Sequence, residues 1–152
     1  MAAAIKPASS GGASGFALRL LAFLLGVFFI FNGIDKAAWF ADSSLLAERL
    51  AGWSQNGTAA TRWYIDTVAR PGVPLFARLV PLAELATGAA LVVGWWTRPV
   101  ALAALVMVSN FNFARGMFHT GEILTDGVGL PVMGALLALV IAGARLPGRV
   151  GR

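Results

Sequence analysis

Long apolar stretches alternate with short polar ones along most of the chain. Four of them carry almost no charge: residues 16–34, 75–96, 99–114 and 127–144. A helix needs about 20 residues, at 1.5 Å each, to cross a hydrocarbon core of about 30 Å. The glycines inside these stretches would weaken a helix in water but are common in membrane helices. The pattern therefore predicts an all-α protein, an integral membrane four-helix bundle.

The one long connection, residues 37–73, has helical periodicity of its own. Ser43 or Ser44 can cap a helix that runs through Trp53, and residues 58–69 can form a second one. The aromatic residues of this connection suit a membrane interface: Trp39, Phe40, Trp53, Trp63 and Tyr64. We expect short amphipathic helices that cover the outer membrane surface, in preference to a catalytic lid. Residues 1–15, rich in Ala, Ser and Gly, are expected to form a flexible tail before a single domain, residues 16–148.

The composition favours a membrane protein over a soluble bundle. Charged residues make up 12% of the 152 residues, against roughly 25% in an average soluble domain, which is too few to cover a soluble surface. The chain has no Cys and one His, so we expect no metal site, haem or iron–sulfur cluster within it. Its net charge is +5, but the basic residues are dispersed, so we expect the lipid bilayer and not a nucleic acid as the polyanionic partner.

The two sides of the predicted membrane bundle differ in net charge. The side of both termini and of the turn at 96–98 has six basic residues and no acidic one: Lys6, Arg19, Arg98, Arg145, Arg149 and Arg152. The other side has six basic and six acidic residues and so no net charge: Lys36, Arg49, Arg62, Arg70, Arg78 and Arg115 against Asp35, Asp42, Glu48, Asp66, Glu122 and Asp126. The basic residues number six on each side, but those of the second side lie partly in the long connection, where charge has less influence on orientation, so we expect both termini inside.

Glu84 is a carboxylate inside the second predicted span. It is the tenth residue of that span, about 14 Å from the outer end. A carboxylate at such a depth costs about 2.5–3.5 kcal/mol, so it should face protein and be paired or protonated. Ala77, Pro81 and Gly88 lie on the same helical face, so another helix can approach closely. Two interpretations stay open, a structural interhelical hydrogen bond and a role with substrate or protons.

Asn110 is the expected partner of Glu84. Glu84 lies twelve residues before Trp96 and Asn110 twelve after Arg98, so a tight turn would bring the two to one depth, where the amide can donate to the carboxylate. Asn112 would point about 200° away. Further polar residues gather near the outer ends of the spans: Lys36, Arg78, Arg115, His119, Glu122 and Asp126. With Glu84 they predict a polar funnel, although snorkelling and helix capping would also explain the outermost groups.

The motifs around these residues resemble a known family. Gly33-x-x-Lys36 is followed by Ala83-Glu84-x-x-x-Gly88-x-x-Leu91-x-x-Gly94-x-x-x-Arg98 and by a Gly-rich ending, Gly143-Ala-Arg-Leu-Pro147-Gly148. Over residues 18–148 the chain resembles the DoxX/DoxD-like family of small four-helix membrane proteins, and its long first loop is similar to that of DoxD-type members. His119 does not clearly match the histidine pattern of the family.

The resemblance implies membrane redox chemistry, with thiosulfate:quinone oxidoreductase as the named activity. We expect a subunit in the cytoplasmic (inner) membrane of a bacterium or archaeon, with Glu84 as catalytic residue and a quinone or small polar substrate in the funnel. The substrate-binding residues would be Lys36, Arg78, Asn110, Arg115, His119 and Asp126. The alternative is a non-catalytic membrane module that anchors or assembles a redox or stress-response partner. The partner would be a second membrane or extracytoplasmic subunit, or another copy of the chain.

Overall fold

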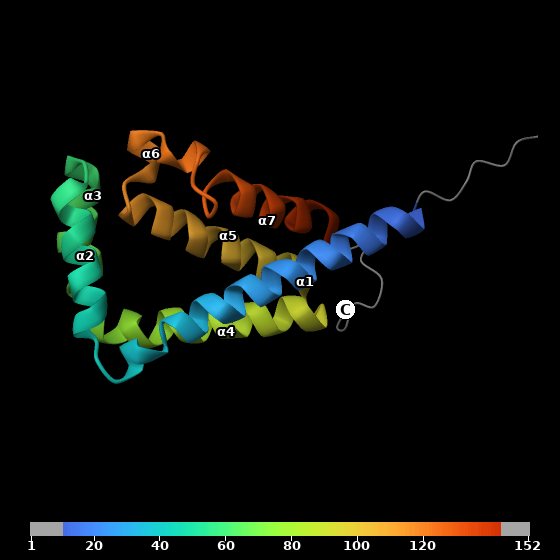
Figure 1. Ribbon diagram of the computed structural model, residues 1–152, viewed down its shortest axis with the longest axis horizontal. Helices are drawn as coiled ribbons and strands as arrows, with labels where there is room; N and C mark the ends of the chain where they lie inside the picture. Colours follow the sequence, from blue (N-terminus) through green and yellow to red (C-terminus); the bar gives the residue numbers. More distant parts are fainter. Residues whose placement is uncertain (1–10, 144–152) are drawn as a thin grey trace, which may run out of the picture.

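Four long helices run along the molecule in the computed structural model, which describes residues 11–143 (Figure 1). They are α1 (Gly11–Asp35), α4 (Val73–Val93), α5 (Thr97–Ala114) and α7 (Leu130–Ala142). α1 packs along α4 and α5 along α7, and contacts of α4 with α5 and of α1 with α7 join the two pairs. The described residues form no β-strand, so the predicted all-α class is confirmed.

The helices of the long connection lie across one end of the four long helices (Figure 1). They are η1 (Ala37–Phe40), α2 (Ser44–Asn56), α3 (Ala59–Tyr64) and η2 (Ile65–Ala69), and two short turns, α6 (Met117–Thr120) and η3 (Glu122–Leu124), lie between α5 and α7. Ser43 makes no capping hydrogen bond with its side chain. Instead, Asp42 Oδ1 accepts the Ser44 amide at 2.9 Å, while Thr58 caps α3 by accepting the Thr61 amide. Short helices in this loop are therefore confirmed, with Ser43 at the first N-cap position and Asp42 making the side-chain hydrogen bond.

Two of the four predicted spans are helices long and apolar enough to cross a membrane, Ala13–Asp35 and Val73–Val93. α7 is apolar but has 13 residues, which corresponds to a rise of about 20 Å. Residues 1–10 of the predicted tail lie outside the described residues, as does the chain from 144 onward, with most of the Gly-rich ending. The four-span bundle therefore stays a prediction, with two of its spans supported.

Two apolar cores stabilise the arrangement. The first lies among the long helices and includes Ala22, Phe29, Leu91 and Leu136. The helices of the long connection, η1 to η2 (residues 37–69), are called the cap from here on. The second core lies where the cap packs on α4, and its buried residues are Trp39, Leu46, Leu50, Ile65, Ala69, Val73 and Ala77. Trp39 was expected at the membrane interface, but it is 3% exposed and belongs to this core. The cap is thus packed onto the bundle by its own apolar side chains.

α1 and α4 approach each other closely at two glycines. A Cβ on Gly88 would lie 2.6 Å from the Gly26 carbonyl oxygen, and one on Gly26 would lie 2.8 Å from the Gly88 carbonyl oxygen. Gly88 is buried together with Ala77, Pro81 and Glu84, as the small-residue face of this helix predicts. The helix that packs against this face is α1. The sequence had suggested α5, the next long helix along the chain.

Gly88→Ala is expected to destabilise the protein by about 1–3 kcal/mol, because the added methyl group meets backbone that cannot move aside cheaply. Gly134→Ala in α7 is the matched control, since a Cβ there meets nothing within 4 Å. Thermal unfolding in a mild detergent measures both variants. Equal melting temperatures for the two would contradict the close crossing.

Candidate functional site

A cavity of about 190 Å³ opens where α1, α2, α4 and α5 meet. Its polar lining residues come from all four helices and the turns that follow them: Asn32, Lys36, Arg49, Glu84, Asn112 and Arg115. Its aromatic walls are Phe28, Phe29, Trp39, Trp53 and Phe111. Three cations and one carboxylate thus share a small space with flat apolar walls. We call this space the polar cavity.

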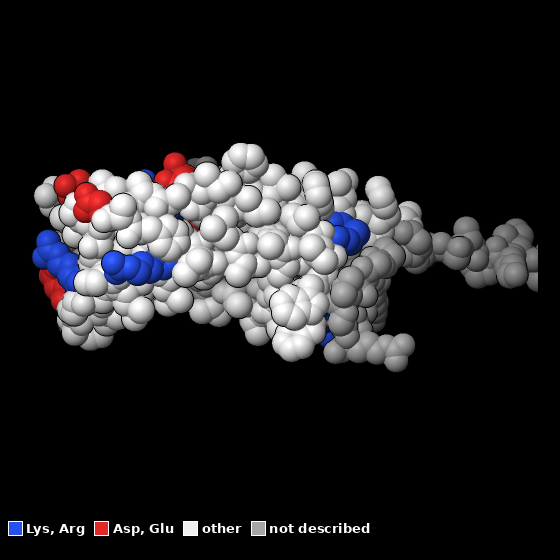
Figure 2. Space-filling view, turned by 90° about the horizontal axis from the view of Figure 1, so that it is seen from below, with Lys and Arg blue, Asp and Glu red and all other residues white. Residues whose placement is uncertain are grey.

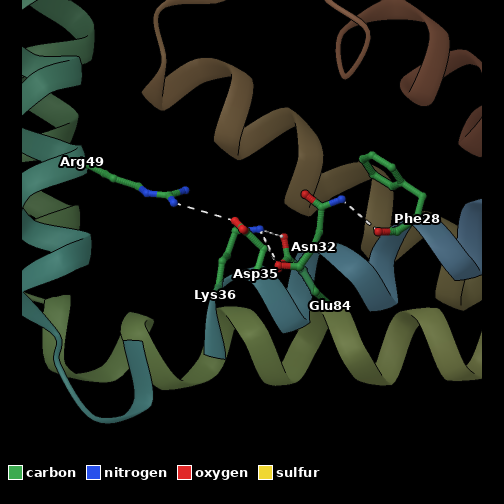
Figure 3. A network of polar contacts seen from close by, with 6 residues as sticks. All are labelled: Phe28, Asn32, Asp35, Lys36, Arg49 and Glu84. Carbon is green, nitrogen blue, oxygen red and sulfur yellow. Dashed lines mark hydrogen bonds and ion pairs between the residues drawn. The ribbon is translucent and has the colours of Figure 1, made fainter. Parts of the chain in front are cut away.

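Lys36 and Glu84 form a buried ion pair in the polar cavity (Figure 3). The Lys36 ammonium donates to both carboxylate oxygens, each at 2.9 Å, and to the Asn32 carbonyl oxygen at 3.0 Å. These three bonds use all three N–H groups of the ammonium. Lys36 is 8% exposed and Glu84 4%. The cost of burying the carboxylate is therefore offset by a full counter-charge and two hydrogen bonds.

Asn110 does not form the expected hydrogen bond to Glu84. Both Glu84 oxygens accept from Lys36, and Asn110 Oδ1 accepts the Tyr64 hydroxyl at 2.6 Å. Glu84 faces α1, where Lys36 follows the last turn. The buried stripe of α5 runs through Ala101, Ala104, Val108 and Asn112, and Asn110 lies off that stripe. The α5 amide that reaches the polar cavity is therefore Asn112, which the sequence analysis had set aside.

Asn112 is fully buried and only half satisfied. Its Nδ2 faces the Val128 carbonyl oxygen and Met133 Sδ, both at 3.5 Å. Within the described residues, its Oδ1 accepts no hydrogen bond. Leaving a buried acceptor unpaired costs about 1–3 kcal/mol, so a group with an O–H or N–H would gain a partner here.

Arg49 reaches from α2 toward the rim of the polar cavity (Figure 3). Its guanidinium lies 3.8 Å from Asp35 Oδ2, with both side chains about half exposed or more. It also stacks over the Trp39 ring at 5.1 Å from the centroid. Exposed ion pairs contribute about 0–1 kcal/mol, so Arg49 is free to turn toward a bound molecule at little cost.

Arg115 is held at the other side of the polar cavity by Asp126, at 3.0 Å. Asp126 also accepts the Val128 amide at 2.8 Å. The pKa of the Asp126 carboxyl lies below its usual value, first because of the hydrogen bond from the Val128 amide and then because of Arg115. The carboxylate thus joins the end of α5 to the segment before α7.

The structure separates the predicted site residues into three groups. Lys36, Glu84 and Arg115 line the polar cavity, and Asp126 contacts it through Arg115. Asn110 lines a neighbouring cavity. Arg78 donates to the Pro74 carbonyl oxygen on the exposed side of its own helix, and the His119 ring lies 6.1 Å from that of Phe113. Neither Arg78 nor His119 lines a cavity described here.

Five residues that line the polar cavity were not predicted from the sequence as site residues: Asn32, Trp39, Arg49, Trp53 and Asn112. Asn32 carried a signal, because it is a polar residue inside an apolar span. Trp53 carried one as well, because it continues the apolar stripe of Leu46 and Leu50, but nothing local showed that Trp39 or Arg49 would line a cavity. Within residues 11–143, no three His, Cys, Asp or Glu side chains come together as a metal would require.

Comparison with known proteins gives one match. A family model described as DoxX matches residues 16–120, from α1 to the end of α6. The matched range includes every polar residue that lines the cavity. Comparisons with curated proteins and with solved structures give no match.

Proposed function

The chain belongs to the DoxX family, and from this premise we propose that it is a subunit of a membrane oxidoreductase that binds a quinone headgroup in the polar cavity. The observation that carries the proposal is the buried Lys36–Glu84 pair inside aromatic walls. A quinone headgroup is a flat ring with an oxygen at each end, and flat apolar walls with a few convergent polar groups are what such a ring needs.

The lining residues fit this ligand chemically. Arg49 and Arg115, whose guanidinium groups keep unused N–H groups, can donate to a carbonyl oxygen. Asn112 Oδ1, which lacks a donor within the described residues, can accept from a hydroxyl of the reduced ring. The ring itself can lie against Phe28, Trp53 or Phe111, since offset aromatic stacking contributes about 0.5–1.5 kcal/mol beyond the buried area.

When bound, a quinone takes up two electrons, here from a reduced partner, and two protons. The role of the chain is to hold the ring and to deliver protons. Lys36 Nζ lies 2.9 Å from both Glu84 oxygens, so each of the two protons would pass from the ammonium through the carboxylate to a ring oxygen, and the first would be replaced before the second is transferred. Arg49 lines the same cavity and its side chain is about half exposed, so water at this rim would replace each proton.

We propose that the long helices cross a membrane with the cap outside. On the face seen in Figure 2, charged side chains gather at the cap end and reappear at the opposite end, and the middle carries none. At the opposite end, Arg19 donates to the carbonyl oxygens of Leu91 and Val92. There Arg98 Nε also donates to the Val140 carbonyl oxygen at 2.7 Å. Both cations therefore stabilise helix C-termini where headgroups would lie.

Single cysteines test this orientation cleanly, because the chain has none of its own. Ser54→Cys in the cap is expected to react with an impermeant thiol reagent on intact cells, and Ser9→Cys only after lysis. The reverse labelling would overturn the orientation, and labelling of both on intact cells would overturn the proposed span number.

Quinone binding is tested directly on the purified protein. Solvent extraction of the protein purified in mild detergent is expected to release about one quinone molecule per chain. Added quinone should also quench the fluorescence of Trp39 and Trp53, which line the polar cavity. Trp63 is 64% exposed and lines neither cavity described here, so Trp63→Phe should leave the quenching constant unchanged. No bound quinone and no saturable quenching would exclude quinone binding and favour the anchoring role.

A further inference from the structure

A second, smaller cavity lies beside the polar cavity and shares two of its walls. It measures about 60 Å³ and is lined by residues of α2, α3, η2, α4 and α5. Trp53 of α2 and Phe111 of α5 line both cavities. These two aromatic side chains therefore border both spaces. We call the second space the apolar cavity.

The lining of the apolar cavity offers almost no polar group to a ligand. Its walls include Leu46, Leu50, Phe76 and Val80. The two polar side chains that line it, Tyr64 and Asn110, are bonded to each other at 2.6 Å. A water molecule needs two to four polar partners to be held in a cavity, and these walls do not supply them. An apolar occupant fits better than water.

We propose that the apolar cavity receives the first part of the side chain of the same ligand whose headgroup occupies the polar cavity. The ligand would then be an amphiphile, a quinone with a hydrocarbon chain. This inference rests on the proposed function. The chain would leave the ring between Trp53 and Phe111, whose side chains must turn aside to join the two spaces, and would then contact Leu50 and Val80.

The size of the cavity limits how much of the chain it can hold. Each buried methylene tightens binding by about fourfold. A space of about 60 Å³ holds only a few carbon atoms, so the first few should matter and later ones should not. The dependence of affinity on chain length should therefore rise steeply and then become flat.

The test compares two probes on two variants. The probes are 2,3-dimethoxy-5-methyl-1,4-benzoquinone and the same ring with a decyl chain. Val80→Phe fills the apolar cavity from α4, and Val106→Phe, at a site 63% exposed on α5, makes the same enlargement outside both cavities. Val80→Phe is expected to raise the Kd of the decyl probe at least tenfold while leaving the Kd of the chain-free probe unchanged. Val106→Phe should alter neither, and partition of the chain into detergent is common to all samples.

The outcomes separate the two proposals. If the chain-free probe does not bind the wild type, the proposed quinone site fails. If it binds and Val80→Phe leaves the decyl probe unaffected, or weakens both probes equally, the chain site alone is wrong. Should Val80→Phe not fold, a decyl probe with a diazirine on its third carbon decides the matter on the wild type. Labelling confined to residues of α2, α3, η2, α4 and α5 that line the apolar cavity supports the proposal, and labelling elsewhere overturns it.

Discussion

Lys36→Met is expected to lower the free energy of unfolding by about 3–5 kcal/mol, because it leaves Glu84 buried without a counter-charge. In the wild type Glu84 is 4% exposed, and Lys36 is the donor to both of its oxygens. Removing the cation therefore removes the compensation for the buried charge. Unfolding of the purified protein in mixed micelles measures the change.

Two further variants identify the cause of that loss. Arg49→Met removes a cation from the exposed rim pair, 3.8 Å from Asp35, and should cost at most about 1 kcal/mol. Combining Lys36→Met with Glu84→Leu removes both buried charges and should recover most of the stability. If Lys36→Met is no worse than Arg49→Met, the buried pair is not the stabilising contact described above.

Glu84→Gln is expected to fold and to lose quinone reduction by a factor of about 10²–10⁴, because the amide cannot take up or release a proton. Gln keeps the size of the side chain and one oxygen that can accept a hydrogen bond from Lys36 Nζ, which lies 2.9 Å from Glu84 Oε1 in the wild type. Its loss of stability should therefore be smaller than that of Lys36→Met. Isolated membranes with their own electron donor provide the assay, and the melting temperature is measured on the same preparation.

A stability loss could itself reduce turnover, so a matched variant is needed. Gly88→Ala is expected to destabilise the α1–α4 crossing without changing a titratable group, and its turnover per folded molecule should stay near that of the wild type. Glu84→Ala is uninformative, since it opens a cavity under either interpretation. Wild-type turnover per folded molecule in Glu84→Gln, together with a loss of stability, would show that Glu84 acts only through its structural contact with Lys36.

The helical nature of the chain was readable from the sequence, because helix formation depends on local periodicity. Apolar stretches long enough for a membrane gave the four long helices, and the amphipathic pattern of residues 44–53 gave α2. The small-residue face of α4 was also predictable, since Ala77, Pro81, Glu84 and Gly88 follow one another at helical spacing and are buried together.

The partners across helices were decided only by the tertiary structure. Sequence neighbours suggested that Glu84 would meet α5, but the glycines at 26 and 88 let α1 approach α4 more closely, and this places Lys36 beside Glu84. The orientation of α5 about its own axis places Asn112, and not Asn110, in the lining of the polar cavity. Hydrophobic periodicity shows which face of a helix is buried, but the fit of all faces together determines which helix covers it and which polar groups meet.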